Sequence, residues 1–344
     1  MDKRNVLVIY TGGTIGMTVN PDSKSLEPVE FKNLRQQLPM LDVIEANIEF
    51  KDMLPLIDSS DTNPDFWIRL AKMIGNEYDN YDGFVVLHGT DTMAYTASAL
   101  SFLLENLAKP VILTGSQLPL GVIRTDGRRN ILNAISIASE YRNGKPAIQE
   151  VCIYFQNALF RGNRTYKCDA SKFHAFESPN YSRLADINTN IEYHEDHIHH
   201  ETGQAPLIVH NRMDTNVALV KLYPGISIDC LRAVFNIPGL RAVVMETYGV
   251  GNAPTSQEFN ATLQEAVQNG LVIVNVTQCK GGGSVQMGKY LTGKKLADIG
   301  ILSGYDMTTE ATITKLMYVL GQTSDLEEIR WQMSISLRGE MTLD

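Results

Sequence analysis

Two threonine-rich turns carry the residues of this sequence that are best suited to chemistry. The first is Thr-Gly-Gly-Thr, Thr11–Thr14, directly after an apolar run that begins at Val6. The second is "HGTDTM", His88–Met93, which also follows an apolar run. A threonine hydroxyl becomes a nucleophile when a neighbouring group takes its proton. Asp91, in the second turn, offers a fixed negative charge suited to an ammonium group.

A nucleotide-binding interpretation of the first turn is disfavoured. The dinucleotide motif G-x-G-x-x-G opens a helix, and a P-loop needs Lys-Ser/Thr after its glycines. Here residues 17–28 read "MTVNPDSKSLEP", a loop pattern in which no Lys-Ser/Thr pair directly follows the glycines. A catalytic threonine, with glycines that let a substrate approach and a loop that closes as a lid, is one remaining interpretation. A strand-end turn that only caps backbone groups is the other.

Two further stretches offer binding groups. "DSSD", Asp58–Asp61, precedes a helical pattern, where backbone N–H groups attract anions such as a carboxylate. Its alternative is an ordinary Asp/Ser helix cap. "RGNRTYK", Arg161–Lys167, ends on a lysine that can assist a threonine if it is buried beside one. A surface lysine is the alternative. Thr90, Asp91 or Thr92 can likewise be read as a helix cap.

A histidine tract invites a metal interpretation, which the sequence disfavours. Four of the seven histidines fall in "HEDHIHH", His194–His200. The order lacks H-E-x-x-H, and no further ligand set has zinc spacing nearby. The sequence therefore predicts a solvated tract in a connector and no metal site.

Composition narrows the class of protein. The chain has 344 residues, 44% of them hydrophobic, and a formal net charge of −9. A nucleic-acid binder is disfavoured because its surface would be basic. The four cysteines are scattered without a C-x-x-C pair, which is typical of reduced cytosolic proteins. No stretch resembles a secretory leader or approaches the ~18 apolar residues of a membrane helix. We therefore expect a cytoplasmic protein without a membrane partner.

The elements around these motifs predict a two-domain α/β fold. Short buried strands alternate with amphipathic helices, a rhythm typical of a parallel sheet covered on both faces. In the first half the predicted strands are 84–89, 111–115 and 151–155, and the predicted helices are 63–78, 93–108 and 130–141. In the second half the strands are 217–223, 242–246 and 271–276, and the helices are 227–236, 255–269 and 308–321.

The rhythm weakens in the polar stretch "LADINTNIEYHEDHIHHETGQAP", read as connector with one short edge strand. We expect a larger N-terminal domain over 1–192 that carries the catalytic residues and has a mainly parallel sheet with flanking helices. We expect this domain to be followed by a connector over 193–212 and then by a smaller C-terminal parallel α/β domain over 213–344.

Taken together, the motifs resemble the L-asparaginase family, in particular its type I, cytoplasmic bacterial branch. The likeness runs along essentially the whole chain, in "YTGGTIG", "DSSD", "LHGTDTMAYTASALSF", "TGSQLP", "RTDGRRN", "RGNRTYK", "LYPGIS" and "YGVGNAP". The resemblance implies hydrolysis of L-asparagine to L-aspartate and ammonia. It also implies a homotetramer built as a dimer of dimers, with no cofactor and no metal.

The resemblance also implies residue roles. Thr14 would be the nucleophile that forms an aspartyl ester, and Thr90, Asp91 and Lys167 would form a second triad. Substrate binding would involve Asp58, Ser59, Ser60, Thr90, Asp91 and Ser116, with Asp91 on the α-ammonium. Backbone N–H groups beside Thr90 are suited to stabilising the oxyanion.

Two departures from the family pattern stand out. The family often carries a tyrosine on the loop after TGGT, and here Leu26 falls near that place. Some type I members also have a regulatory asparagine site with an arginine and a threonine where this chain has Glu246 and Tyr166. A carboxylate cannot pair with an effector's carboxylate, so we expect the allostery to be altered or absent. Cys279 is retained there, and Asn252 is expected in the effector pocket or facing a neighbouring subunit.

Two other functions stay open. One is a glutaminase-asparaginase or related amidohydrolase, such as a tRNA-linked amidotransferase subunit, although the acidic chain shows no RNA-binding surface. The other is a non-enzymatic amino-acid sensor on the same scaffold, which the joint presence of Thr14, Thr90, Asp91 and Lys167 disfavours.

Overall fold

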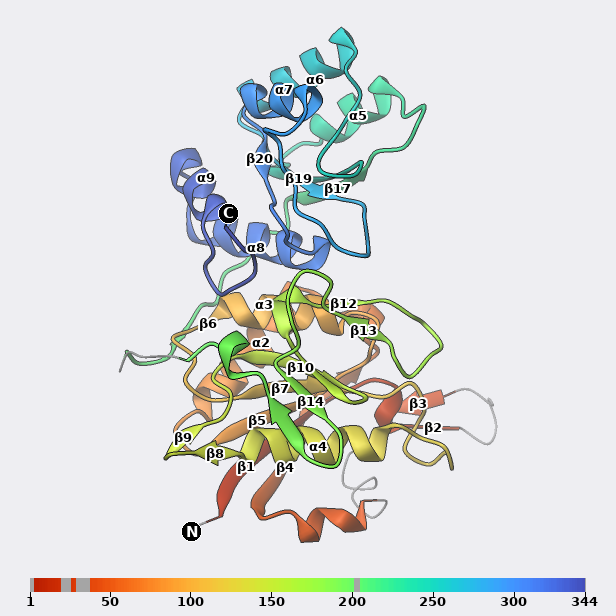
Figure 1. Ribbon diagram of the computed structural model, residues 1–344, viewed down its shortest axis with the longest axis vertical. Helices are drawn as coiled ribbons and strands as arrows, with labels where there is room; N and C mark the ends of the chain where they lie inside the picture. The colour runs from red at the N-terminus through yellow and green to blue at the C-terminus, as the bar shows by residue number, and fades with distance from the viewer. Residues whose placement is uncertain (1–2, 20–25, 29–37, 201–204, 344) are drawn as a thin grey trace. The chain divides into compact units, whose positions relative to one another are not determined.

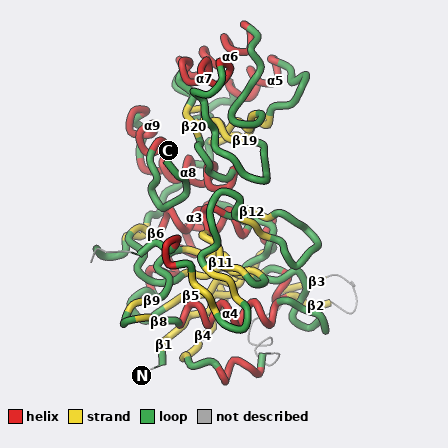
Figure 2. The backbone as a smooth tube through the Cα atoms, viewed as in Figure 1, coloured by secondary structure: helices red, strands yellow, loops and turns green. Residues whose placement is uncertain are grey.

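The structure, a computed structural model, describes residues 3–19, 26–28, 38–200 and 205–343 (Figures 1 and 2). The chain forms two compact units, residues 1–211 and 212–344. Each unit is a sheet covered by helices, so the predicted two-domain α/β class is confirmed. No helix among these residues is long and apolar enough to cross a membrane.

The larger unit is built on a sheet of eight strands in the order β15-β14-β11-β10-β7-β5-β1-β4. Its five strands from β4 to β10 run parallel, and the three on the other edge are antiparallel to their neighbours. The strands are β1 (Arg4–Gly12), β4 (Ala46–Ile57), β5 (Gly83–Leu87), β7 (Val111–Thr114), β10 (Val151–Phe155), β11 (Ala158–Arg161), β14 (Ala185–Ile187) and β15 (Ile191–Tyr193).

Helices cover both faces of this sheet. α4 (Gly127–Ser139) packs on β1, β5, β7 and β10, while α3 (Met93–Leu103) packs on β7, β10 and α2 (Pro64–Asn76). Figure 1 shows α3 and α4 on opposite sides of the strands. Because both faces are covered, β5, β7 and β10 are buried along their whole length, as their unbroken apolar runs predicted. Helix α2 begins after Asn63, whose side chain accepts a hydrogen bond from the Phe66 amide at 3.0 Å.

Three regions of the fold differ from the sequence-based expectation. The predicted helix 93–108 ends at Leu103, because β6 (Leu104–Glu105) pairs with β16 (Ile208–Val209). The polar stretch read as connector with one short edge strand contributes two strands, β14 and β15, to the main sheet. Strand β4 was not predicted, since its alternating polar residues hide the strand pattern.

The remaining elements of this unit are short. Residues 17–19 and 26–28, which follow TGGT, pair as antiparallel strands where a loop was predicted. Most of the expected lid lies outside the described residues, which omit 20–25 and 29–37. The short elements are η1 (Thr14–Gly16), β2 (Met17–Val19), β3 (Leu26–Pro28), η3 (Pro39–Val43), η4 (Ser59–Asp61), β8 (Tyr141–Arg142), β9 (Lys145–Pro146), η5 (Gly162–Arg164), β12 (Tyr166–Lys167), β13 (Phe176–Glu177) and η6 (Glu195–His197).

The smaller unit has a parallel four-stranded sheet in the order β17-β18-β19-β20. Its strands are β17 (Val217–Lys221), β18 (Ala242–Thr247), β19 (Val272–Thr277) and β20 (Leu302–Ser303). Its helices are α5 (Ile228–Phe235), α6 (Gln257–Gln268), α7 (Leu291–Ile299), α8 (Thr309–Gln322) and α9 (Leu326–Ser334), of which α7 and α9 were not predicted. Ser227, Ser256 and Thr308 cap α5, α6 and α8 through their side chains.

Candidate active site

The strand order brings three of the sequence motifs to one edge of the large sheet. Strand β1 lies between β4 and β5, with Gly12 opposite Ile57 and Tyr10 opposite Leu87. The TGGT, DSSD and HGTDT turns continue from the carboxyl ends of these three parallel strands. Ligands of open α/β sheets bind at that end of the strands.

Glycines allow the three turns to touch. A Cβ on Gly13 would lie 2.4 Å from the amide nitrogen of Gly89, and one on Gly89 would lie 2.4 Å from Ser59 Oγ. Gly13 also has φ 84° and ψ 170°, a backbone conformation that only glycine adopts readily. Side chains larger than hydrogen would therefore hold the turns apart.

A polar pocket of about 170 Å³ lies where the turns meet. It is smaller than the roughly 300–1,000 Å³ of sites for drug-sized ligands, so it suits a small molecule. Its lining contains hydroxyls, carboxylates, one lysine and one amide. The lining residues are Gly13, Thr14, Asp58, Ser59, Gly89, Thr90, Asp91, Gln117, Lys167 and Ala170.

Lys167 links the two predicted members of the second triad. Its ammonium Nζ donates to Thr90 Oγ1 at 2.8 Å and to Asp91 Oδ1 at 2.6 Å. Thr90 is buried and the lysine side chain is 16% exposed, whereas that of Asp91 is 66% exposed. The helix-cap interpretation does not describe these side chains: Thr92 is the N-cap residue of α3, and its hydroxyl donates to the Ser59 carbonyl at 2.7 Å.

Thr14 opens the one-turn helix η1 and lines the pocket half-buried. Among the described residues, its hydroxyl has no hydrogen-bond partner. Leu26 begins β3, whose backbone pairs with Val19 in β2, but its side chain lies outside the described part of the structure. No described side chain thus replaces the missing loop tyrosine at the Thr14 hydroxyl.

The DSSD segment acts as a cap and also reaches the pocket. Asp58 Oδ1 accepts hydrogen bonds from the amide and the hydroxyl of Ser60, both at 2.9 Å, and so caps η4. Asp58 and buried Ser59 line the pocket, while Ser60 is not among its described lining residues. The segment is a separate turn before α2, which has its own cap at Asn63.

The buried side chain of His88 stabilises the HGTDT turn through hydrogen bonds of both ring nitrogens. Its Nε2 accepts from Thr96 Oγ1 at 3.0 Å, and that hydroxyl accepts from Trp67 Nε1 at 2.9 Å. His88 Nδ1 must then carry the proton that it donates to the Gly89 carbonyl at 2.7 Å. Burial lowers the pKa of His88 to about 4, and the imidazole is neutral near pH 7. Sequence reasoning assigned this residue no role.

The TGSQLP motif places a different residue in the pocket from the one we named. Ser116 is buried and its hydroxyl donates to the Leu118 carbonyl at 2.6 Å, so it does not appear in the described lining. Its neighbour Gln117 does, with Oε1 3.5 Å from Thr90 Oγ1. The backbone N–H of Gln117 donates to both carboxylate oxygens of Asp126, and these bonds fix the turn. The sequence signal, polar residues shortly after a buried strand, does not distinguish Gln117 from Ser116.

The predicted effector residues are divided between the two units. In the larger unit, Tyr166 donates from its hydroxyl to Glu177 Oε2 at 3.2 Å. In the smaller unit, Thr292 donates to Asn252 Oδ1 at 2.5 Å, and exposed Cys279 bonds through its amide to Thr277 Oγ1 at 3.1 Å.

Glu246 is buried in the smaller unit and paired internally. Thr309 Oγ1 donates to its Oε1 at 2.7 Å, and Lys221 Nζ to its Oε2 at 3.1 Å. Burial acts to raise the pKa of Glu246, but these hydrogen bonds and the charges of Lys280 and Lys221 outweigh it and hold the pKa below its ordinary value. The Glu246 carboxylate is therefore ionised, and the positive charges of Lys221 and Lys280 balance its negative charge.

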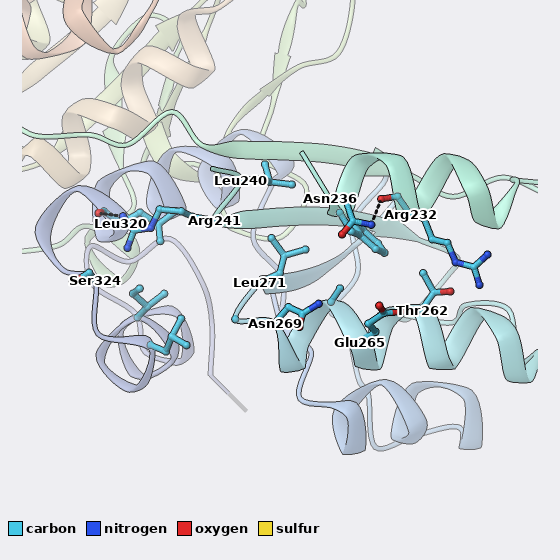
Figure 3. A pocket seen from close by; sticks show the side chains of 15 residues that line it. Arg232, Asn236, Leu240, Arg241, Thr262, Glu265, Asn269, Leu271, Leu320 and Ser324 are labelled. Carbon is cyan, nitrogen blue, oxygen red and sulfur yellow. Dashed lines mark hydrogen bonds between the residues drawn. The ribbon is translucent and has the colours of Figure 1, made fainter. Parts of the chain in front are cut away.

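A second cavity, of about 240 Å³, lies in the smaller unit and carries no predicted residue. Figure 3 shows Arg241 on one side and Arg232 on the other. Arg241 binds Asp214 and the Leu320 carbonyl, both at 2.8 Å, and Arg232 pairs with Glu258 at 3.2 Å. Both arginines are therefore committed to the fold.

The histidine tract makes local polar pairs. His194 Nε2 lies 2.9 Å from Asp186 Oδ2, His200 lies 3.5 Å from Glu195, and His197 packs edge-on against Tyr181. Among the described residues, three potential metal ligands converge at a different place, Cys168, His174 and Glu177.

Comparisons with known proteins identify the family of this chain. The model of the family described as Asparaginase, N-terminal, matches residues 5–199, and that of the Glutaminase/Asparaginase C-terminal domain matches residues 216–333. L-asparaginase 1 of Escherichia coli (strain K12) is 47% identical, with 100% of each chain covered. The 60 kDa lysophospholipase of Mus musculus is 42% identical over 99% of this chain and 63% of its own length. The crystal structure of L-asparaginase I from Vibrio cholerae has a TM-score of 0.89 and 42% identity, covering 99% of this chain and 100% of the other.

Proposed function

The chain belongs to the asparaginase family and is an L-asparaginase, and we propose that it hydrolyses L-asparagine through an ester on Thr14. The observation that carries the proposal is the single small pocket shared by Thr14, Thr90, Asp91 and Lys167. A threonine ester divides a difficult amide cleavage into two easier steps.

In the first step Thr14 Oγ1 attacks the side-chain carbonyl carbon of asparagine. Its proton passes to the leaving amide nitrogen, which departs as ammonia. The backbone N–H groups at Gly89 and Thr90 are suited to stabilise the oxyanion, because both residues line the pocket. In the second step water attacks the ester and releases aspartate.

Lys167 and Thr90 handle protons in this proposal. The 2.8 Å bond from Lys167 Nζ to Thr90 Oγ1 orients that hydroxyl toward the pocket, where it can relay a proton or direct the attacking water. Asp91 binds the α-ammonium of the substrate while its Oδ1 holds Lys167. Asp58 and Ser59 take part in binding the α-carboxylate of the substrate. Ser60 and Ser116 support them.

The pocket argues against larger or apolar substrates. Apart from glycines, Ala170 is the one apolar residue in its described lining, so no surface there would hold an acyl chain. Glutamine remains the relevant competitor. Its extra methylene moves the scissile carbonyl by about 1.3 Å, and a misplacement of about 1 Å can cost ~100-fold in rate.

We propose two further properties from the resemblance to type I enzymes, namely a homotetramer and a cytoplasmic location. Four free cysteines, one of them fully buried, support a reducing compartment. Light scattering of the purified protein and fractionation of the source cells test the two statements.

The deciding experiment uses purified protein and compares ammonia release from asparagine and glutamine with fatty-acid release from a lysophospholipid. We expect asparagine to be the preferred substrate. Thr14→Ala should abolish hydrolysis and also the ester that mass spectrometry detects after acid quenching of the wild-type reaction. Full activity of Thr14→Ala would overturn the nucleophile, and binding of asparagine without turnover would favour the sensor alternative.

A further inference from the structure

A cluster of potential metal ligands lies on the hairpin that carries Lys167. Strands β12 and β13 pair through Lys167 and Phe176, and the Cys168 amide donates to the Ala175 carbonyl at 2.8 Å. This pairing brings together Cys168, His174 and Glu177. One ligand atom from each lies within 4.8 Å of the other two.

The three side chains offer one sulfur, one nitrogen and one oxygen ligand. Zinc takes these ligand types in tetrahedral sites with bonds of about 2.0–2.3 Å, which corresponds to ligand atoms ~3.5 Å apart. His174 Nε2 and Glu177 Oε1 are 4.0 Å apart, close to that spacing. Their side chains are 45% and 48% exposed, so they can adjust and solvent can reach them.

Neighbouring contacts prepare the cluster without blocking it. The Tyr166 hydroxyl donates to Glu177 Oε2 and leaves Oε1 directed toward His174. Such outer hydrogen bonds orient carboxylate ligands in metal sites. Asp169 accepts hydrogen bonds from the amides of Ser171 and Lys172, both at 2.8 Å, which shapes the loop between the ligands.

The same loop forms part of the active-site wall. Lys167 directly precedes Cys168, and Ala170 lines the pocket. The Lys172 carbonyl accepts a hydrogen bond from Gln117 Nε2 at 2.8 Å. Closing a chelate between Cys168 and His174 therefore acts on a segment that contacts the pocket in two places.

We propose that Cys168, His174 and Glu177 form a Zn²⁺-binding site whose occupation reversibly inhibits the enzyme. As the zinc–sulfur bond forms, the thiol releases its proton to solvent, and water fills the fourth position. Drawing the ligands together by about 1 Å displaces the hairpin at Lys167, and a shift of that size can lower the rate by ~100-fold. The inhibition rests on the proposed role of Lys167, whereas metal binding does not.

Cobalt provides a test of binding that is independent of activity. Added Co²⁺ should give a thiolate-to-cobalt charge-transfer band in the near ultraviolet with the wild-type protein. Cys168→Ser should lose the band, and Cys230→Ser, which removes an exposed thiol on α5, should keep it. A band of unchanged strength in Cys168→Ser would overturn the site.

Zinc inhibition is tested separately with asparagine as substrate. Micromolar Zn²⁺ should lower kcat by about 10- to 100-fold, and EDTA should restore it. His174→Gln and Glu177→Gln should keep their activity when zinc is added, while His200→Gln, in the histidine tract, should be inhibited like the wild type. Equal inhibition of all these variants would overturn the proposal. If the cobalt band is present but zinc leaves kcat unchanged, the inhibition is overturned.

Discussion

The backbones of Gly13 and Gly89 touch so closely that a Cβ on Gly13 would lie 2.4 Å from the Gly89 nitrogen. We expect Gly13→Ala to lower kcat/KM by at least ~100-fold, because the two turns must separate by about 1 Å or more. Strained backbone and overpacking should also cost about 2–5 kcal/mol of unfolding free energy. Asparagine kinetics and urea denaturation measure the two effects.

Gly144 supplies the matched control for that substitution. It has φ 80°, close to the φ 84° of Gly13, but nothing lies within 4 Å of its Cβ position. Gly144→Ala should therefore cost only about 1–2 kcal/mol and leave kcat/KM unchanged. If both variants lose activity equally, the close approach of the turns is not what matters.

Lys167→Met should lower kcat by roughly 10²- to 10⁴-fold, the usual contribution of a positioned proton-transfer group. The 2.8 Å bond to Thr90 and the 2.6 Å ion pair with Asp91 disappear together. Lys172→Met removes a 77% exposed lysine from the same loop and should have little effect. Single-turnover kinetics with asparagine give the comparison, and a wild-type kcat in Lys167→Met would contradict the assignment.

Acid should destabilise the protein through His88. The folded-state pKa is about 4, below the ordinary value of 6.5, so between these values the unfolded chain binds more protons than the native one. Stability is complete above pH 6.5 and declines as the pH falls toward 4, by about 3 kcal/mol in total. His88→Gln lacks this dependence, and denaturation of both proteins at pH 7 and pH 4.5 isolates it. Parallel pH curves would refute the buried neutral imidazole.

Breaking the ion pair of Lys315 and Glu340 should destabilise the smaller unit strongly. Both side chains are fully buried with Nζ and Oε1 2.6 Å apart, and the carboxylate also accepts from the amides of Leu337 and Arg338. Lys315→Met should cost about 3–5 kcal/mol, because it leaves a buried charge uncompensated. Arg232→Met, which breaks an ion pair exposed on both sides, should cost less than about 1 kcal/mol. Thermal unfolding distinguishes the two.

Asparagine saturation should be hyperbolic. Glu246 is neutralised by Lys221 and Lys280 and accepts from Thr309, so its charge is unsuited to an effector's carboxylate. Initial rates over a wide range of asparagine concentrations test this. Sigmoidal rates that become hyperbolic in Glu246→Ala would show that an effector site has survived.

The sequence predicts the fold best where burial is uniform. Strands such as β10 are unbroken apolar runs, and their bounds match the prediction at Val151 and Phe155. Strand β4 alternates exposed and covered positions at the sheet edge, so its polar residues conceal it. Leu104 continues the apolar pattern of α3 but leaves the helix to pair with Val209, a partner that no local pattern reveals.

The candidate site was also predictable only in part from local sequence patterns. The turns that follow parallel strands meet at one edge of the sheet, which can be predicted from the sequence. This arrangement brings Thr14 and Thr90 into one pocket. Which of two consecutive side chains faces the pocket depends on the turn, and the structure places Gln117 there instead of Ser116. The proximity of His174 to Cys168 depends on a hairpin of two residues per strand, which is too short to leave a periodic signal.

The parallel pairing of β1 with β5 has a consequence for synthesis of the chain. Val6 pairs with Gly83, and Lys167, which bonds to Thr90, follows β10 and β11 in the chain. At roughly 5–20 residues per second, a ribosome needs on the order of ten to thirty seconds between Thr14 and Lys167. The nascent N-terminal segment therefore remains catalytically silent, and recovery of activity after dilution from denaturant should report completion of the sheet and not early collapse.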